Sequence, residues 1–319
     1  MSILTIAIPT YNRQHKLERC LLQICEQIAK EGLHHQVGVL VSDNASTDDT
    51  AMFLETFQFS GVTVEMLYQL ENLGFDGNVH ELYVHCKSEY IWYFADDDIL
   101  FDGAIARVVA TIHSNLPQVL MFSFEQPPGS GIRFFDYPND VYLPQSLDEQ
   151  AELVFRVPKV TAYILQKKET VAAVIEESKE FLGTNFYFIA LCYSLLNHAP
   201  NPRVAVISDV LAGADEGYTE MRFSADTFIY QASILRHPFL EKVDQAYISR
   251  RKRELYYGSI QALWAVAVGA WKVDDTEDYK VASSRVPIRP FWLISRPRSA
   301  LQLVILKFRV TRFILGKIR

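Results

Sequence analysis

The 319-residue chain is 49% hydrophobic and 22% charged, with a formal net charge of −7. This composition is that of a globular protein that can bury a large core. Residues 249–319 hold 15 Lys or Arg against 5 Asp or Glu, so the rest of the chain is strongly acidic. An acidic body with a basic end argues against wholesale nucleic-acid binding and favours an end that touches an anionic surface such as a membrane.

The cysteines and the N-terminus indicate a cytoplasmic protein. The cysteines form no CxxC pair, which predicts buried apolar thiols in a reducing compartment. The N-terminus reads as a strand and lacks the basic region and cleavage site of a signal peptide. The longest apolar run, Gly258–Trp271, is shorter than the about 18 residues of a membrane span and predicts a packed helix.

In chain order, the first 125 residues alternate between short apolar runs and amphipathic segments. The apolar runs predict strands at 3–8, 37–41, 62–67, 90–95 and 119–124, and the segments between them predict helices at 17–28, after Thr47, at 79–86 and at 102–115. Ser46 or Thr47 is the expected cap of the second helix. Strands that alternate with helices in this way predict a doubly wound α/β layer with a mainly parallel sheet.

Polar clusters follow four of these strands, at 9–13, 43–49, 72–78 and 96–98. The carboxyl ends of parallel strands share one edge of a sheet, so we expect the four clusters to converge on one crevice. Turn chemistry explains each cluster singly. It does not explain why two of the four strands end in acids.

Three adjacent carboxylates, Asp96, Asp97 and Asp98, end the strand at 90–95. Their repulsion is poorly screened at the end of a buried strand, and a divalent cation would compensate for it. In an extended segment, side chains at i and i+2 point the same way, so Asp96 and Asp98 could share one ligand while Asp97 points elsewhere. Carboxylates with open positions suit Mg²⁺ or Mn²⁺. The alternative is that the acids cap the helix near Asp102.

The second half of the chain is less regular. Residues 132–143 predict a hairpin or irregular cover, 204–210 a strand, and 147–156, 169–179, 183–196 and most of 224–271 helices. Residues 289–319 carry eight Lys or Arg and no acid among bulky apolar side chains. Such a segment is typical of a membrane-surface element; a solvated tail or a contact between copies of the chain, as in a homo-oligomer, are the alternatives.

Four motifs in this order together resemble the family 2 glycosyltransferases of the GT-A fold. They are IPTYNR at 8–13, VSDNASTD at 41–48, NLG at 72–74 with Asn78, and ADDD at 95–98. Within that family the chain is similar to bacterial enzymes that build O-antigen or capsular polysaccharide, in particular the abequosyltransferase-like branch.

The resemblance implies a metal-dependent, inverting transfer of a sugar from a nucleoside diphosphate (UDP, GDP, CDP or dTDP) to a saccharide or lipid-linked saccharide. It implies a catalytic domain at 1–220, with a nucleotide half at 1–125 and an acceptor half at 126–220, followed by a helical extension at 221–319. A metal, Mn²⁺ or Mg²⁺, is implied at Asp98 with Asp96. Nucleotide contacts are implied at Pro9, Thr10, Tyr11, Arg13, Asp43, Asn72, Gly74, Asn78, Asp96 and Asp97.

One expected feature of the family is missing. Many members carry a Glu-Asp pair at the start of a helix, but residues 183–190, which correspond to it, contain no acid. The candidates for the general base that inversion needs are therefore Asp215 and then Glu216, in a loop after a strand. Two other functions stay open: a sugar-1-phosphate nucleotidyltransferase, which would need a Gly-rich loop where Pro9–Arg13 has no glycine, and a non-catalytic nucleotide-sugar-binding partner in polysaccharide assembly.

Overall fold

The computed structural model describes residues 2–125, 130–131, 133, 140–156, 159–167, 171–214 and 227–267, of which 227–230 and 259–267 are described by their backbone alone. The chain divides into two compact units, Met1–Glu216 and Gly217–Arg319. The basic segment at 289–319 and the candidate bases Asp215 and Glu216 lie outside the described residues.

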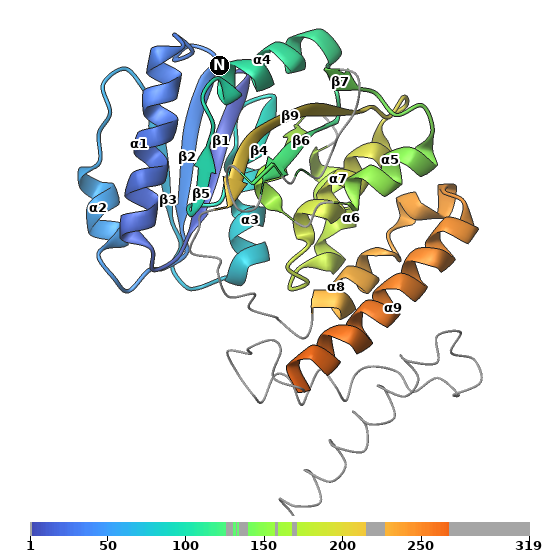
Figure 1. Ribbon diagram of the computed structural model, residues 1–319. Helices are drawn as coiled ribbons and strands as arrows, with labels where there is room; N and C mark the ends of the chain where they lie inside the picture. Colours follow the sequence, from blue (N-terminus) through green and yellow to red (C-terminus); the bar gives the residue numbers. More distant parts are fainter. Residues whose placement is uncertain are drawn as a thin grey trace, which may run out of the picture. The chain divides into compact units, whose positions relative to one another are not determined.

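The first unit is built on one nine-stranded sheet, whose strands lie side by side in Figure 1. The main path of the sheet runs β3-β2-β1-β4-β8-β6-β9-β5, and β7 pairs with β9. The strands are β1 (Leu4–Thr10), β2 (Val37–Asp43), β3 (Val64–Tyr68), β4 (Tyr90–Tyr93), β5 (Asp98–Leu100), β6 (Val119–Glu125), β7 (Val141–Tyr142), β8 (Tyr163–Gln166) and β9 (Val204–Ala214).

Strands β1 to β4 pair in parallel, as the alternating pattern predicts. Strand β8 then pairs antiparallel with both β4 and β6, and β9 runs parallel to β6. β6 and β9 therefore point the same way as β1 to β4, whereas β8, β5 and β7 run against them. The prediction of a mainly parallel α/β sheet is confirmed, although β5 and β8 were not expected.

The helices of this unit connect the strands and pack on the sheet. They are α1 (Gln14–Lys30), α2 (Thr50–Thr56), α3 (Gly74–His85), α4 (Ala104–Asn115), α5 (Leu147–Val154), α6 (Val171–Ser178) and α7 (Tyr187–His198), with short 3-10 turns at η1 (Val160–Ala162) and η2 (Lys179–Phe181). The expected cap of α2 was wrong. The N-cap is Asp49, which makes no side-chain capping bond. Thr50 N donates to Asp48 at 3.0 Å, and Ser46 N donates to Asp43.

The second unit is helical over its described part, as expected. It contains α8 (Thr227–Ile234), the 3-10 turn η3 (Pro238–Lys242) and α9 (Gln245–Ala267). Before η3, the buried His237 side chain accepts a hydrogen bond from Phe239 N at 3.2 Å. This bond satisfies one of the amide groups that a helical start leaves without an internal partner.

The core of the first unit is centred on β4, in which all four residues are fully buried. The Trp92 ring packs edge-on against Phe94 and Phe122, with centroids 5.7 and 5.5 Å away. Its indole nitrogen donates to Thr161 O at 2.8 Å. This contact fixes η1 beside the end of β4, where the acidic triplet begins.

Candidate active site

The turn after β1 fastens the ends of β1 and β2 to each other. Asn12 has a φ of 53°, in the left-handed region that asparagine tolerates better than most residues. Its backbone N–H donates to Ser46 Oγ at 2.9 Å, and its side-chain oxygen accepts from Thr47 N at 2.7 Å. The first two polar clusters therefore meet, as their positions at strand ends predict.

The acidic triplet forms a turn, so the expected extended geometry was wrong. Asp98 N donates to Ala95 O at 3.2 Å, and Asp98 then opens β5. Asp96 accepts from Thr10 Oγ1 at 2.7 Å and from Arg13 Nη1 at 2.9 Å. Arg13 Nη1 also donates to Asp97 at 2.9 Å. Asp96 and Asp97 thus share a guanidinium group.

Asp98 is held from a different part of the chain. The Thr161 hydroxyl donates to Asp98 Oδ2 and accepts from Ala95 N at 3.0 Å. Burial raises the pKa of Asp98 to about 7 and also raises that of Asp96, where the nearby Arg13 opposes the effect. A positively charged ligand would therefore stabilise the ionised form of both carboxylates. The alternative that the acids cap the next helix does not hold, since β5 separates them from α4, whose N-cap is Gly103.

The loop before α3 is tied to the end of β2 through Asn44. The Asn44 amide donates to Asn72 Oδ1 at 3.0 Å and to Gly74 O at 3.2 Å, and its oxygen accepts from Leu73 N at 2.9 Å. Gly74 starts α3 with a φ of 71°, a conformation open to glycine at little steric expense. The third cluster therefore joins the first two.

Asn78 carries an acceptor without a partner among the described residues. Its amide nitrogen donates to Ser42 O at 3.1 Å, whereas its buried Oδ1 has no hydrogen bond. A buried acceptor left without a partner is unfavourable. Asn78 lines the cavity formed by the clusters, so a donor group on a bound molecule would satisfy this oxygen.

These clusters enclose a cavity of about 320 Å³ at the carboxyl ends of β1, β2 and β4. Of the ten residues for which the resemblance implies nucleotide contacts, all but Asp43 and Asp97 line it. Asp43 is buried and accepts a hydrogen bond from Ser46 N at 3.2 Å. The lining residues are Pro9, Thr10, Tyr11, Arg13, Asn44, Asn72, Gly74, Phe75, Asn78, Ala95 and Asp96.

Three of the residues at the site were not assigned from the sequence. Asn44 stands beside Asp43 in the second motif, so its polarity at a strand end was an available signal. Asp76 lies within the third cluster, but its partners are far along the chain. Thr161 carried no signal, because the hydroxyl that reaches Asp98 comes from a segment without a polar cluster.

Asp76 supplies a carboxylate to the start of α7, where the chain has no acid of its own. It is 3% exposed and accepts from Asn185 N at 2.8 Å and from Tyr187 N at 3.3 Å. On the same face of α3, His80 Nδ1 lies 2.9 Å from the Tyr187 hydroxyl oxygen. The loop that lines the cavity is thereby joined to the expected acceptor half.

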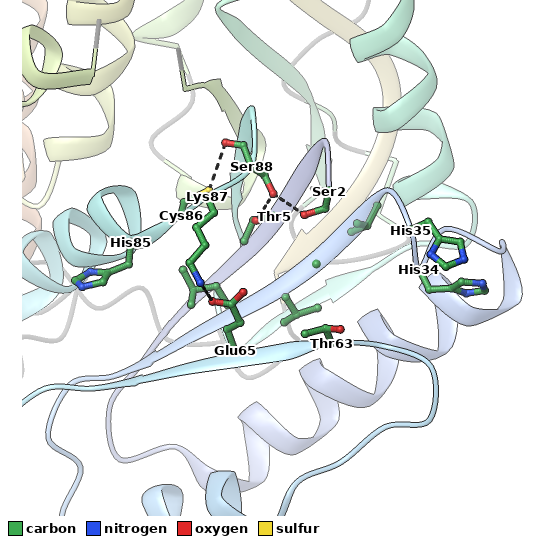
Figure 2. A pocket seen from close by; sticks show the side chains of 14 residues that line it. Ser2, Thr5, His34, His35, Thr63, Glu65, His85, Cys86, Lys87 and Ser88 are labelled. Carbon is green, nitrogen blue, oxygen red and sulfur yellow. Dashed lines mark hydrogen bonds and ion pairs between the residues drawn. The ribbon is translucent and has the colours of Figure 1, made fainter. Parts of the chain in front are cut away.

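A second cavity, of about 330 Å³, lies at the amino-end side of the same strands and is lined by a different set of side chains. Figure 2 shows Ser88 between Ser2 and Thr5, with its hydroxyl oxygen 2.7 Å from each of theirs. Lys87 is paired with Glu65 at 2.7 Å in the same view. These five polar side chains of the second cavity therefore bind one another, and none of the four strand-end clusters lines it.

The acidic turn fits a divalent cation by the chemistry of its donors. Over the described residues, no group of three or more His, Cys, Asp or Glu side chains is arranged to hold a metal. Mg²⁺ at phosphate sites is usually bound by one or two carboxylates together with phosphate oxygens and water. Asp98, with Asp96 nearby in the turn, matches that smaller donor set.

The fold is of the GT-A type, with a polar cavity and an acidic turn at the carboxyl edge of an α/β sheet. Residues 5–163 match the family model "Glycosyl transferase family 2". The chain therefore carries a glycosyltransferase family 2 domain, which places it among the glycosyltransferases.

Two relatives are similar to this chain over part of their length. Abequosyltransferase RfbV of Salmonella typhimurium is 26% identical over 212 residues, covering 61% of each chain. The GalNAc(5)-diNAcBac-PP-undecaprenol beta-1,3-glucosyltransferase of Campylobacter jejuni is 29% identical over 110 residues, covering 34% of each chain. The match therefore spans less than two thirds of either relative.

Solved structures agree on the fold. Staphylococcus aureus TarS 1-349 in complex with UDP-GlcNAc superposes with a TM-score of 0.63 at 14% identity, covering 98% of this chain and 92% of that one. The mannosyltransferase PcManGT of Pyrobaculum calidifontis, in complex with GDP-Man and Mn²⁺, gives a TM-score of 0.53 at 14% identity, covering 97% of this chain and 87% of that one. Among the described helices of this chain, none is long and apolar enough to cross a bilayer.

Proposed function

We propose that this chain is a metal-dependent, inverting glycosyltransferase that moves a sugar from a nucleoside diphosphate to a saccharide or lipid-linked saccharide in bacterial surface polysaccharide synthesis. The observation that carries the proposal is the 320 Å³ cavity, which brings together side chains from four separate strand ends. The two partial relatives, by their names an abequosyltransferase and an undecaprenol-linked glucosyltransferase, support this class of substrate.

In this proposal the cavity binds the nucleotide and the acidic turn faces the diphosphate. The unpartnered Asn78 oxygen accepts a hydrogen bond from the base or ribose, and Tyr11, which is 40% exposed at the rim, offers a ring face. Arg13 holds Asp96 and Asp97 in place. Asp98, with Asp96, would hold Mn²⁺ or Mg²⁺, which supplies positive charge for the departing diphosphate.

Inversion in one displacement requires a base on the acceptor hydroxyl. Asp215 and then Glu216 stay our candidates, since they follow β9, whose end pairs with β5 next to the acidic turn through Ala214 and Asp98. We further propose that the protein is cytoplasmic and that its basic segment at 289–319 binds an anionic membrane surface peripherally. Co-sedimentation of the full chain and of a chain truncated before Arg296 with anionic vesicles tests the last point; equal binding would contradict it.

The test of the function begins with nucleotide binding. Thermal unfolding is measured with UDP, GDP, CDP and dTDP, each with and without Mn²⁺, because a ligand that binds only the folded state raises the melting temperature. We expect one nucleotide to raise the melting temperature strongly, and to do so only when the metal is present. The corresponding nucleotide sugars are then assayed for nucleotide release with saccharide and lipid-linked acceptors.

Two variants make the test specific. Asp98→Asn is expected to abolish metal-dependent transfer while leaving the fold intact. Asp102→Asn is the matched control, because its side chain is 94% exposed and lies past β5. Near-normal transfer by Asp98→Asn would refute the metal assignment. Pyrophosphate release from a nucleoside triphosphate would favour a nucleotidyltransferase, and nucleotide-sugar binding without turnover would favour a non-catalytic partner.

A further inference from the structure

We propose that Thr161 is a positioning residue that aims the Asp98 carboxylate at the cation. The inference rests on the proposed function, because it concerns the metal of that same site. Thr161 is fully buried in η1 and follows Asp98 by 63 residues in the sequence, yet its hydroxyl contacts Asp98 directly.

The hydroxyl of Thr161 bridges the two ends of the acidic turn. Its oxygen accepts from Ala95 N at 3.0 Å. An amide can only donate, and a hydroxyl has one proton, so that proton is directed to Asp98 Oδ2. One side chain therefore fixes both the residue before the triplet and the last acid of the triplet.

Thr161 is itself rigidly placed. Its backbone oxygen accepts from the indole nitrogen of Trp92 at 2.8 Å, and Trp92 belongs to the fully buried strand β4. Oδ2 of Asp98 receives the hydroxyl, so we assign the other carboxylate oxygen to the cation. A carboxylate oriented in this way loses less rotational freedom when a metal binds.

This arrangement distinguishes Asp98 from its neighbours. Asp96 and Asp97 are bound by the Arg13 guanidinium, a charged group. Asp98 receives a neutral hydroxyl, which orients the carboxylate without neutralising its charge. Thr161 thus fixes one acid of the triplet without bringing a counter-charge to it.

The experiment measures Mn²⁺ binding directly, by electron paramagnetic resonance of free Mn²⁺, with the full chain and a saturating amount of the nucleotide that stabilises it. Thr161→Val has the same shape without the hydroxyl and is expected to raise the Kd for Mn²⁺ by about 10- to 100-fold, the usual effect of losing a group that orients a metal ligand. Thr161→Ser restores the hydroxyl and is expected to bind within about threefold of the natural chain.

Thr111→Val is the matched control, because Thr111 is also buried and its hydroxyl donates to Arg107 O at 2.8 Å within α4. Its Mn²⁺ affinity is expected to stay unchanged. If Thr161→Val does not fold, as judged by thermal unfolding, Thr161→Ala replaces it in the comparison.

The outcomes separate the two proposals. A folded Thr161→Val chain with the natural Mn²⁺ affinity would overturn this inference alone. A natural chain that binds nucleotide but no Mn²⁺ would overturn the metal dependence in the proposed function, and this inference with it.

Discussion

Asp76 offers a direct measurement of how the cavity loop is joined to the start of α7. Its carboxylate is 3% exposed and accepts hydrogen bonds from Asn185 N and Tyr187 N. These bonds lower its pKa, but burial acts more strongly and raises the pKa from the usual 3.8 to about 6. The Asp76 carboxyl therefore binds its proton more tightly in the folded chain than in the unfolded chain.

The size and sign of the effect follow from linkage between proton binding and folding. A pKa that is higher in the folded state gives stability that is fully present below the unfolded value and is lost as the pH rises through the folded value. A shift of this size corresponds to about 3 kcal/mol. Asp76→Asn removes the titration, so the stability of the natural chain minus that of the variant should fall by up to about 3 kcal/mol between pH 4 and pH 7.5.

The assay is urea unfolding of the natural chain, Asp76→Asn and Asp102→Asn at several pH values in this range. Other titrating groups are common to all three proteins, so their effects cancel in the differences. Asp102→Asn removes an exposed surface carboxylate and should change the stability by less than about 0.5 kcal/mol. A stability difference for Asp76→Asn that does not change with pH would refute the reasoning, since burial could then not dominate the pKa of Asp76.

Three further predictions concern the cavity. Gly77→Ala would place a Cβ 2.7 Å from Leu73 Cβ, so the loop must shift. Nucleotide affinity, measured by titration, should then fall at least about tenfold. In the control Gly38→Ala, the new Cβ would lie at an ordinary 3.5 Å from Ser2 Oγ, and nucleotide affinity should stay normal. Thr10→Val removes the 2.7 Å hydrogen bond to Asp96 and should lower the free energy of urea unfolding by about 1.5–3 kcal/mol, whereas Thr10→Ser should not. Removing metal with EDTA should abolish most of the melting-temperature increase caused by the preferred nucleotide, and an undiminished increase would contradict a bridging metal.

Much of this site could be predicted from the sequence because it is made of strand ends. Parallel strands place their carboxyl ends at one edge whatever the details of their packing. The polar clusters after β1, β2, β3 and β4 therefore had to be neighbours, and the hydrogen bonds from Thr10 to Asp96 and from Asn44 to Asn72 are the result.

The parts that could not be predicted depend on pairing between distant segments. Strand β8 is a four-residue apolar run, and nothing local indicates that it enters antiparallel between β4 and β6. Strand β5 begins at the third acid of the triplet, so its pairing with β9 decides where that acid points. Thr161 lies just before β8 and reaches Asp98 only because β8 pairs with β4.

The acidic triplet shows why that pairing matters for chemistry. Three adjacent carboxylates repel one another at the buried end of a strand. In a straight segment only a bound ligand would offset this repulsion. The turn instead gives the three acids different partners within the protein. Arg13 is bound to Asp96 and Asp97 at 2.9 Å each, and Lys16 also lies 3.5 Å from Asp97, so these two acids have cationic partners within the fold. Asp98 receives the Thr161 hydroxyl, which orients the group and supplies no charge of its own. The position of Asp98 is therefore set by the long-range pairing of β8 with β4 and of β5 with β9, whereas the number of acids is set locally. For this reason the pattern of residues alone indicated a cation that Asp96 and Asp98 could share, and only the family resemblance assigned the metal to Asp98 with Asp96.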